Sequence, residues 1–276
     1  MYKRNIQSLL HALLGEFRMV YLTGPRQSGK TTLARIVAQS LSLRYVSLDD
    51  QATRAAAEFD PHGFIRSLGE ARVVLDEFQY VPALIPAIKE ASDQLAPDQR
   101  GKFLLTGSAD LFASTRTQEA MPGHLARLEL LPLSANEIAG DRPNAVDFLL
   151  GEQYPRQVDY PPLTRNQIAD AIIRGGYPEP VGKSQRFRRV WFDSYIRGRL
   201  LKDFESLYAT RKDCHTNIAA LAPYLSGLSG NLLKYAKVGS DLRLDDRLVK
   251  RYIETLELMF IVQRVPGYVK NRAKRL

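Results

Sequence analysis

A glycine-rich turn between two apolar runs constrains the fold of this chain more than any other part of its sequence. Residues 24–31 read GPRQSGKT, which fits the pattern G-x-x-x-x-G-K-[ST]. The run FRMVYLT at 17–23 predicts a strand before the turn, and the residues from Gly29 onward predict a helix after it. A phosphate-binding loop requires this order of strand, turn and helix. The sequence therefore predicts a P-loop that binds ATP.

The chemistry of phosphate binding explains the residue types in this loop. Glycines let consecutive backbone N–H groups turn around a β-phosphate, and the following helix directs the positive end of its dipole at the anion. The Lys30 ammonium can reach the β- and γ-phosphate oxygens, and the Thr31 hydroxyl can bind Mg²⁺. A chance glycine-rich turn is the alternative. The predicted nucleotide-binding residues are Gly24, Pro25, Arg26, Gln27, Ser28, Gly29, Lys30, Thr31 and Thr32.

A second motif ends the run RVVLDE at residues 72–77. Asp76 follows Lys30 by 46 residues and is predicted to hold Mg²⁺ together with Thr31, as the aspartate of a Walker B strand does. Glu77 is a candidate catalytic residue, because a carboxylate beside a metal ligand can accept a proton from water aligned on the γ-phosphorus. A solvated acidic strand end is the alternative. The Asp-Glu pair predicts hydrolysis of ATP rather than binding alone.

Further apolar runs alternate with helical patterns over the first 130 residues. RYVSLD at 44–49, KFLLTG at 102–107 and LARLELL at 125–131 predict strands. This alternation predicts an α/β P-loop NTPase fold, a parallel sheet with helices on both faces. The strand at 102–107 is expected between the other two motif strands. It leads into Ser108, a candidate catalytic sensor of the γ-phosphate together with Thr106, and capping of the next helix is the alternative role.

The alternation of strands and helices stops near Ser134. Residues 141–162 contain four prolines among polar residues, which indicates a loop or insertion. After GGYPEPVG at 175–182 the pattern is helical. We therefore expect an ATPase core over residues 1–133 and a helical lid or linker with a proline-rich insertion over 134–182. A helical linker and a mainly α-helical domain are expected over 183–276.

Positive charge is concentrated in the last third of the chain. Residues 1–180 carry 19 Lys and Arg against 21 Asp and Glu, a net charge of −2, whereas residues 181–276 carry 20 against 9, a net charge of +11. A basic region of this kind can bind nucleic acid phosphates, and a solvated helical face is the alternative. DNA is therefore a predicted partner of residues 181–276.

The pattern from residue 216 onward is that of a winged helix-turn-helix. Three helical stretches are followed by LMFIVQRVPGYV, which predicts a wing of two strands. The third helix is predicted to begin at Asp245 as its N-cap. Arg247, Lys250 and Arg251 would lie on the recognition helix and contact phosphates. Packing of this helix between domains or subunits is the alternative.

Five stretches together resemble a known family. LTGPRQSGKTTLA, VVLDEFQYVPALIPAIKE, FLLTGSADL, LLPLSANEI and GGYPEP occur in this order in the chain. They resemble the prokaryotic AAA-superfamily (AAA+) ATPases that pair an ATPase core with a winged-helix region and usually a nuclease-like domain of unknown function. The resemblance implies an AAA+-like core with a small helical lid. It also implies that Lys30 and Thr31 bind ATP·Mg²⁺, Asp76 and Glu77 form the Walker B pair, and Ser108 is the sensor.

The chain departs from this family at three places. The family commonly has Ala-Gly-Arg where this chain has Leu125-Ala126-Arg127, so Arg127 is a candidate catalytic contact to the γ-phosphate, with a surface ion pair as the alternative. Lys202-Asp203 replaces the family's Arg-Asp pair, which puts an arginine finger there in doubt and makes Arg197 and Arg199 the fallback donors. The sequence ends at NRAKRL, near where the family's terminal domain begins, so a truncated chain is expected.

The sequence therefore predicts a Mg²⁺-dependent ATPase that acts as a nucleotide-driven switch or motor on a macromolecular partner, with DNA as the expected partner. A nucleotide-gated binding module with slow or absent hydrolysis is one alternative, and a DNA-binding regulator is another. A homo-oligomer is expected if an arginine completes the site of a neighbouring subunit. The single cysteine, Cys214, and the lack of an apolar segment of roughly 20 residues predict a cytoplasmic protein that does not span a membrane.

Overall fold

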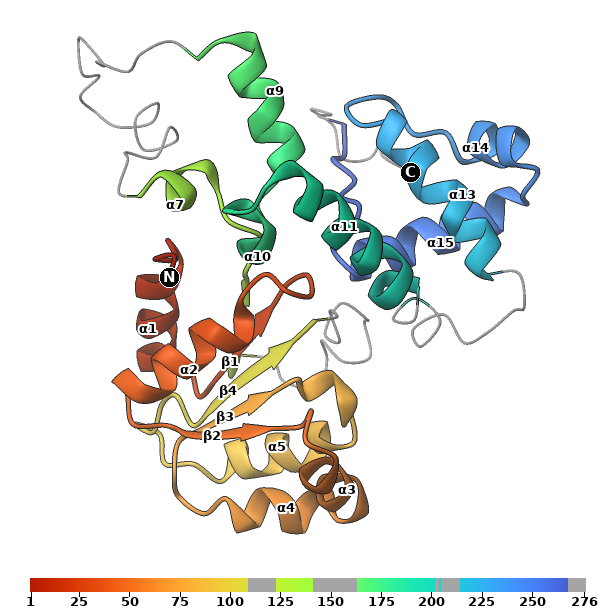
Figure 1. Ribbon diagram of the computed structural model, residues 1–276. Coiled ribbons are helices and arrows are strands. Elements are labelled where there is room, and N and C mark those ends of the chain that lie inside the picture. Colours follow the sequence, from red (N-terminus) through yellow and green to blue (C-terminus); the bar gives the residue numbers. More distant parts are fainter. Residues whose placement is uncertain (109–122, 141–162, 202–203, 205–213, 268–276) are drawn as a thin grey trace. The chain divides into compact units, whose positions relative to one another are not determined.

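The computed structural model describes residues 1–108, 123–140, 163–201, 204 and 214–267, and Figure 1 shows its ribbon. The described chain divides into two compact units, Met1–Phe192 and Asp193–Leu276. The boundary predicted between residues 182 and 183 thus lies within the first unit. Lys202 and Asp203 lie outside the described residues, as does the predicted proline-rich insertion at 141–162.

A parallel five-stranded sheet forms the centre of the first unit. Its strand order is β2-β3-β4-β1-β5, and every neighbouring pair is parallel. β1 pairs with both β4 and β5, so that Tyr21 lies opposite Leu105 on one side and Arg127 on the other. The predicted parallel sheet is confirmed, and β4 lies between the two motif strands β1 and β3 as expected. The strands are β1 (Met19–Thr23), β2 (Arg44–Ser47), β3 (Val73–Asp76), β4 (Phe103–Gly107) and β5 (Leu125–Glu129).

Helices cover both faces of this sheet because its strands carry apolar side chains on both sides. On β1, Met19 and Tyr21 pack in one buried cluster with residues of α3, α4 and α5, whereas Val20 and Leu22 pack in a second cluster with residues of α1 and α2. Figure 1 shows these two helical layers on opposite sides of the strands. The helices are α1 (Gln7–Glu16), α2 (Lys30–Ser40), α3 (Gln51–Phe59), α4 (Pro61–Ser67) and α5 (Leu84–Asp93), with a 3₁₀ turn η1 at Phe78–Tyr80.

The segment that follows β5 connects the sheet to the GGYPEP stretch. Leu130 N–H donates to the Thr23 carbonyl at 2.8 Å, and Leu133 N–H donates to the Gly176 carbonyl at 2.7 Å. Gly176 must lack a side chain, because a Cβ there would lie 2.3 Å from the Leu133 carbonyl oxygen. GGYPEP is thereby held beside the chain that leaves the sheet. The described residues of this region also form the helices α7 (Ala135–Ala139), α9 (Arg165–Arg174), α10 (Pro178–Val181) and α11 (Gln185–Tyr195), the last of which continues into the π-helix η2 (Ile196–Leu200).

The second unit has a separate apolar core formed by α13 (Cys214–Gly227), α14 (Tyr235–Leu242) and α15 (Asp246–Leu258). Phe204 and Tyr252 are buried in it and meet edge to face, with ring centroids 5.4 Å apart. Asp245 caps α15 as predicted, since its carboxylate accepts from the N–H groups of Arg247 and Leu248. Residues 261–267, within the described part of the predicted wing, form no strand, so the wing is not confirmed. None of the helices in the described residues is long and apolar enough to cross a membrane.

Leu104 provides a test of the two-layered packing. This side chain is fully buried on β4 in the cluster shared with α1 and α2. We expect Leu104→Ala to lower the free energy of unfolding by about 2–5 kcal/mol, because it leaves a cavity in a closely packed core. Leu9→Ala is the control, since Leu9 is 49% exposed on α1 and its loss should change the value by less than about 0.5 kcal/mol. Equal effects in urea denaturation would contradict the packing.

Candidate nucleotide-binding site

The turn between β1 and α2 has the backbone of an anion cradle. Gly24, Gln27 and Gly29 all have positive φ, at 146°, 63° and 98°, so the chain curls between the strand and the helix. Gly24 passes so close to β5 that a Cβ would lie 2.2 Å from the Leu130 carbonyl oxygen. Gly29 precedes the first residue of α2 in a left-handed conformation. The N-terminus of α2 therefore opens directly onto the loop.

Lys30 lies inside this loop and is 5% exposed. Its ammonium donates to the carbonyls of Gly24 at 2.9 Å and Pro25 at 2.8 Å. Burial lowers the pKa of Lys30 to about 8; Glu77 and Asp76 raise this pKa, and Arg26 lowers it further. The lysine is thus held within the electrostatic field of both predicted carboxylates.

Asp76 is the centre of a network of hydroxyl groups. It is 2% exposed at the end of β3. Its Oδ1 accepts from Thr31 Oγ1 at 3.3 Å and from Thr106 Oγ1, and its Oδ2 accepts from Tyr45 OH. These donors come from α2, β4 and β2, so the structure brings the predicted metal-binding residues Thr31 and Asp76 together. Tyr45 was not expected in this network. Its pKa is raised to about 12 by burial and by the bond to Asp76, so it remains a donor.

Glu77 follows Asp76 where the chain turns sharply out of the sheet. Its φ of 57° and ψ of 41° are left-handed, which is uncommon for a residue other than glycine. Its N–H donates to Thr106 Oγ1 at 3.2 Å. The strained turn begins η1 and directs Glu77 and Gln79 toward the end of β4.

Gln79 connects two of the three predicted catalytic residues, Glu77 and Ser108. Its amide nitrogen donates to Glu77 Oε2 and to Ser108 Oγ, the latter at 3.1 Å, while its Oε1 accepts from the Ser108 N–H at 3.2 Å. Gln79 was not among the predicted site residues, although it belongs to the DEFQ stretch. Gln79 follows Glu77 by two residues, and this spacing alone does not predict that their side chains meet. The contact forms because Glu77 has a left-handed backbone.

Several buried polar atoms along this loop have no hydrogen-bond partner within the described chain. They include Thr23 Oγ1, Gln27 Oε1 and Ser28 Oγ. Buried polar groups without partners are rare and often mark a place where a ligand or water binds. Hydroxyl and carboxylate oxygens, which Thr31 and Asp76 supply, are ligands that suit Mg²⁺. The donor set and the unpartnered atoms thus fit a nucleotide with Mg²⁺.

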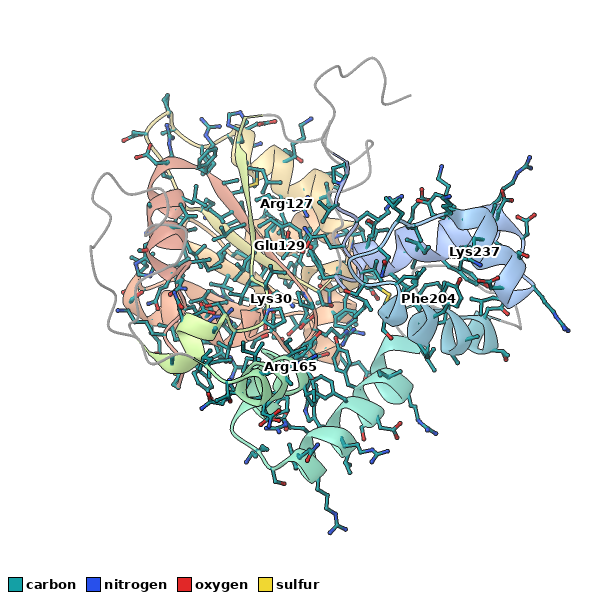
Figure 2. The ribbon with its side chains drawn as sticks, turned by 90° about the horizontal axis from the view of Figure 1, so that it is seen from above. Lys30, Arg127, Glu129, Arg165, Phe204 and Lys237 are labelled. Carbon is teal, nitrogen blue, oxygen red and sulfur yellow. The ribbon has the colours of Figure 1, made fainter. Side chains whose placement is uncertain are left out.

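The remaining predicted residues lie in different settings. Pro25 supplies a carbonyl to Lys30, and Arg26 donates to Tyr80 OH at 3.1 Å. Thr32 lies in the first turn of α2. Arg127 lies within β5 rather than at its end, and Figure 2 labels it close to Glu129; both residues are exposed.

The arginine-finger candidates are in the second unit. Arg197 is 78% exposed and pairs with Asp193 at 2.9 Å in an i,i+4 arrangement. The side chain of Arg199 lies outside the described residues.

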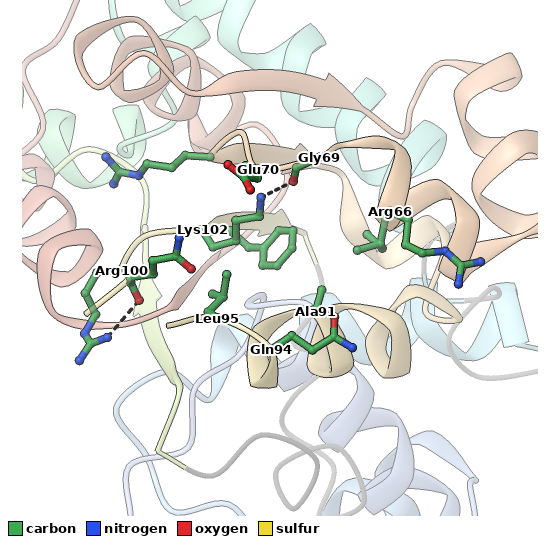
Figure 3. A pocket seen from close by; sticks show the side chains of 12 residues that line it. Arg66, Gly69, Glu70, Ala91, Gln94, Leu95, Arg100 and Lys102 are labelled. Atoms are coloured by element: carbon green, nitrogen blue, oxygen red, sulfur yellow. Dashed lines mark hydrogen bonds between the residues drawn. The ribbon is translucent and has the colours of Figure 1, made fainter. Parts of the chain in front are cut away.

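A hollow lies at the opposite edge of the sheet, where β3 and β4 begin. Its volume is about 520 Å³, and basic side chains line much of it, as Figure 3 shows. Lys102 donates there to the carbonyls of Gly69 at 2.5 Å and Ala71 at 2.7 Å, and Arg72 donates to the Gly101 carbonyl at 3.0 Å. These cations thus satisfy backbone carbonyls. The loop at the other edge of the sheet is the candidate site.

Two family models match parts of the chain. Residues 16–139, which include β1 to β5, match the family model of an AAA domain. Residues 165–276 match a domain of unknown function, DUF8612. The two models match different parts of the chain, and the part that matches the AAA domain contains the candidate site.

The proteins to which the chain is similar include two curated proteins and a solved structure. The uncharacterized proteins Rv2008c of Mycobacterium tuberculosis and Mb2031c of Mycobacterium bovis are each 26% identical over 276 residues, covering 99% of this chain and 55% of theirs. The chain thus spans about half the length of these relatives. The Walker-type ATPase Paby2304 of Pyrococcus abyssi has a TM-score of 0.55 at 15% identity, covering 94% of this chain and 90% of its own. That likeness shows a shared fold.

The lowered pKa of Lys30 predicts how stability depends on pH. The charged lysine is buried, so its pKa of about 8 in the folded chain lies below the ordinary 10.5. A lysine whose pKa is lowered on folding reduces the free energy of unfolding. The full reduction applies below about pH 8, and it disappears as the pH rises toward 10.5. Between about pH 7.5 and 10.5, the free energy of unfolding of the unchanged protein should therefore rise by on the order of 3 kcal/mol relative to that of Lys30→Met.

Urea denaturation at a series of pH values measures this difference. Exposed Lys89→Met is the matched control, because it removes a lysine and leaves Lys30 in place. The control and the unchanged protein should follow parallel curves. If Lys30→Met also runs parallel to them, Lys30 does not carry the penalty of burial.

Proposed function

We propose that this chain binds ATP with Mg²⁺ and hydrolyses the ATP to ADP and phosphate, because residues 16–139 match the family model of an AAA domain. The observation that carries this proposal is the meeting of Lys30, Thr31, Asp76 and Glu77 at one edge of the sheet. A lysine, a hydroxyl and two carboxylates are the groups that P-loop ATPases use for phosphate, metal and water. The proposed site is thus built from α2, β3 and the loop before α2.

The loop residues bind the phosphates in this proposal. Backbone N–H groups of residues 24–32 surround the anion at the N-terminus of α2, where the helix dipole favours negative charge. The Lys30 ammonium exchanges the carbonyls of Gly24 and Pro25 for β- and γ-phosphate oxygens. Because those carbonyls already orient the ammonium within the loop, little rearrangement of the side chain is needed.

Thr31 and Asp76 would hold Mg²⁺. When bound, Mg²⁺ neutralises charge on the phosphate oxygens. The Thr31 hydroxyl and the Asp76 carboxylate are oxygen donors that lie 3.3 Å apart. Tyr45 and Thr106 donate to the same carboxylate and fix its orientation, as partners of metal ligands commonly do.

Glu77 is the proposed general base. Its carboxylate accepts a proton from the water that attacks the γ-phosphorus. Gln79 holds the Glu77 carboxylate and Ser108 in one network, so that Ser108, the proposed sensor, and the base are oriented together. This linkage supports a role for the β4 end in reporting whether a γ-phosphate is bound. Arg127 is retained as an alternative γ-phosphate contact.

We further propose that ATP turnover drives a switch acting on a macromolecular partner. The chain divides into two units, and the proposed lid at residues 134–182 contains α7, α9 and α10 in its described part. An arginine supplied by a neighbouring subunit, with Arg197 and Arg199 as candidates, would make a homo-oligomer the active form. A nucleotide-gated binding module with slow hydrolysis is the alternative, and the Glu77 variant below separates the two.

Binding of DNA is a second proposed function of the second unit. Arg247, Lys250 and Arg251 are all exposed near the start of α15. Three cations within five positions of one helix are suited to phosphate contacts. These contacts would make DNA the partner on which the switch acts.

Glu77→Gln tests the hydrolytic role. Removing the proton acceptor should lower kcat by about 10²–10⁴-fold while the affinity for ATP stays within about twofold. Phosphate release and binding of a fluorescent ATP analogue measure the two quantities. Glu129→Gln is the control, since Glu129 is an exposed carboxylate on β5. An unchanged kcat in Glu77→Gln would refute the assigned role and favour the binding module.

Arg247→Ala combined with Lys250→Ala tests DNA binding. Loss of two phosphate contacts should weaken binding to a duplex at all sequences and reduce the slope of log K against log salt by about 2. Fluorescence anisotropy at a series of salt concentrations measures both effects. Lys30→Ala should leave this binding in place if the second unit carries it. Absence of binding by the unchanged protein at low salt would overturn the proposal.

A further inference from the structure

Arg4 lies behind the phosphate loop and connects three separate segments. The residue is 9% exposed, and each of its guanidinium nitrogens donates one hydrogen bond. Nη1 donates to the Ser28 carbonyl at 2.7 Å, and Nη2 donates to the Leu131 carbonyl at 2.6 Å. Nε donates to Glu137 Oε1 at 3.0 Å. One side chain thereby joins the phosphate loop, the segment after β5 and α7.

The bond to Ser28 bears directly on phosphate binding. The Ser28 carbonyl and the Gly29 N–H belong to one planar trans peptide, so they point in opposite directions. By holding the Ser28 carbonyl, Arg4 fixes the direction of the Gly29 N–H, which points the opposite way. The guanidinium also lies close to this peptide, since a Cβ at Gly29 would be 3.4 Å from Nη1. The orientation of one phosphate-facing N–H therefore depends on Arg4.

Glu137 supplies the anionic partner of this arginine. It is 9% exposed at the third position of α7 and closes a capping box with Ser134. Burial opposes its ionisation, but the N–H groups of Ser134 and Asn5 and the guanidinium of Arg4 hold the pKa of Glu137 below its ordinary value. The carboxylate is therefore charged. The Arg4 guanidinium is held by Glu137 on one side and by the carbonyls of Ser28 and Leu131 on the other.

We propose that Arg4 is a positioning residue of the nucleotide site. It acts through the Ser28–Gly29 peptide, which it orients for the phosphates, and through Glu137 it ties this orientation to α7. A shift of residues 131–137 would move the guanidinium and thus change the affinity of the loop for ATP. This inference rests on the ATP binding proposed above. It adds a link between the phosphate loop and residues 131–137, where the proposed lid at 134–182 begins.

Arg4→Ala, Arg4→Lys and Glu137→Gln test this role in the full chain, with Arg18→Ala as the matched control. Arg18 also donates to a backbone carbonyl, that of Ser92 at 2.8 Å, but it precedes β1 at the opposite end from the loop. Titration with a fluorescent ATP analogue gives the Kd, ATP turnover gives kcat, and thermal unfolding gives the Tm. Both alanine variants remove an arginine-to-carbonyl contact, but only Arg4→Ala removes one to the phosphate loop, so a difference in Kd tests the effect on the loop.

Arg4→Ala should raise the Kd for the ATP analogue about tenfold or more, as expected for loss of a charge-assisted hydrogen bond. Its kcat at saturating ATP should fall less than the affinity does, because Glu77 and Ser108 are untouched. Arg4→Lys and Glu137→Gln should show smaller increases in Kd, since lysine keeps the positive charge although it lacks the planar fork, and the glutamine variant leaves the Ser28 contact. Arg18→Ala should lower the Tm without changing the Kd by more than about twofold.

Two results would overturn the proposal, and they are distinguishable. If the unchanged protein does not bind the analogue, the proposed ATP binding fails and the role of Arg4 fails with it. If the unchanged protein binds and Arg4→Ala binds equally well, only the role of Arg4 fails. Should Arg4→Ala not fold, Arg4→Lys decides the question, because an unchanged Kd in this variant would show that the fork does not position the loop.

Discussion

The buried carboxylate of Asp76 is the group around which the edge of the sheet is organised. A carboxylate that is 2% exposed requires donors nearby, since burial without them is costly. Thr31, Thr106 and Tyr45 supply these donors from a helix and two neighbouring strands. The strand order is what makes this convergence occur, because β3 lies between β2 and β4 and all three strands end at the same edge.

The same edge also contains the features that cost stability. Lys30 is buried with a lowered pKa, and Glu77 has a left-handed backbone. Both are local departures from what a stable core favours, and both occur where phosphate and water would have to be bound. The surrounding contacts hold these departures in place. Lys30 donates to two loop carbonyls, and Gln79 bridges Glu77 to Ser108.

Much of the first unit could be predicted because its signals are local. The apolar runs at 17–23 and 102–107 and the turn at 24–31 each contain their own pattern, and the strands and α2 occur where these patterns lie. Asp245 was likewise predicted as an N-cap. The wing was not confirmed, since an apolar run such as LMFIVQRV fits a strand but forms one only with a pairing partner. In the described residues α15 ends at Leu258 and irregular backbone follows at 261–267.

The sequence by itself determined the chemistry at the candidate site, because the conformational freedom of Gly24 and Gly29 and the functional groups of Lys30, Thr31, Asp76 and Glu77 are properties of those residues. The tertiary structure alone decided which side chains support them. Tyr45 reaches Asp76 because β2 pairs with β3, and Arg4 reaches Glu137 across 133 positions of sequence. No pattern in a single sequence encodes such contacts, since they depend on the order in which strands pair and on where the chain returns.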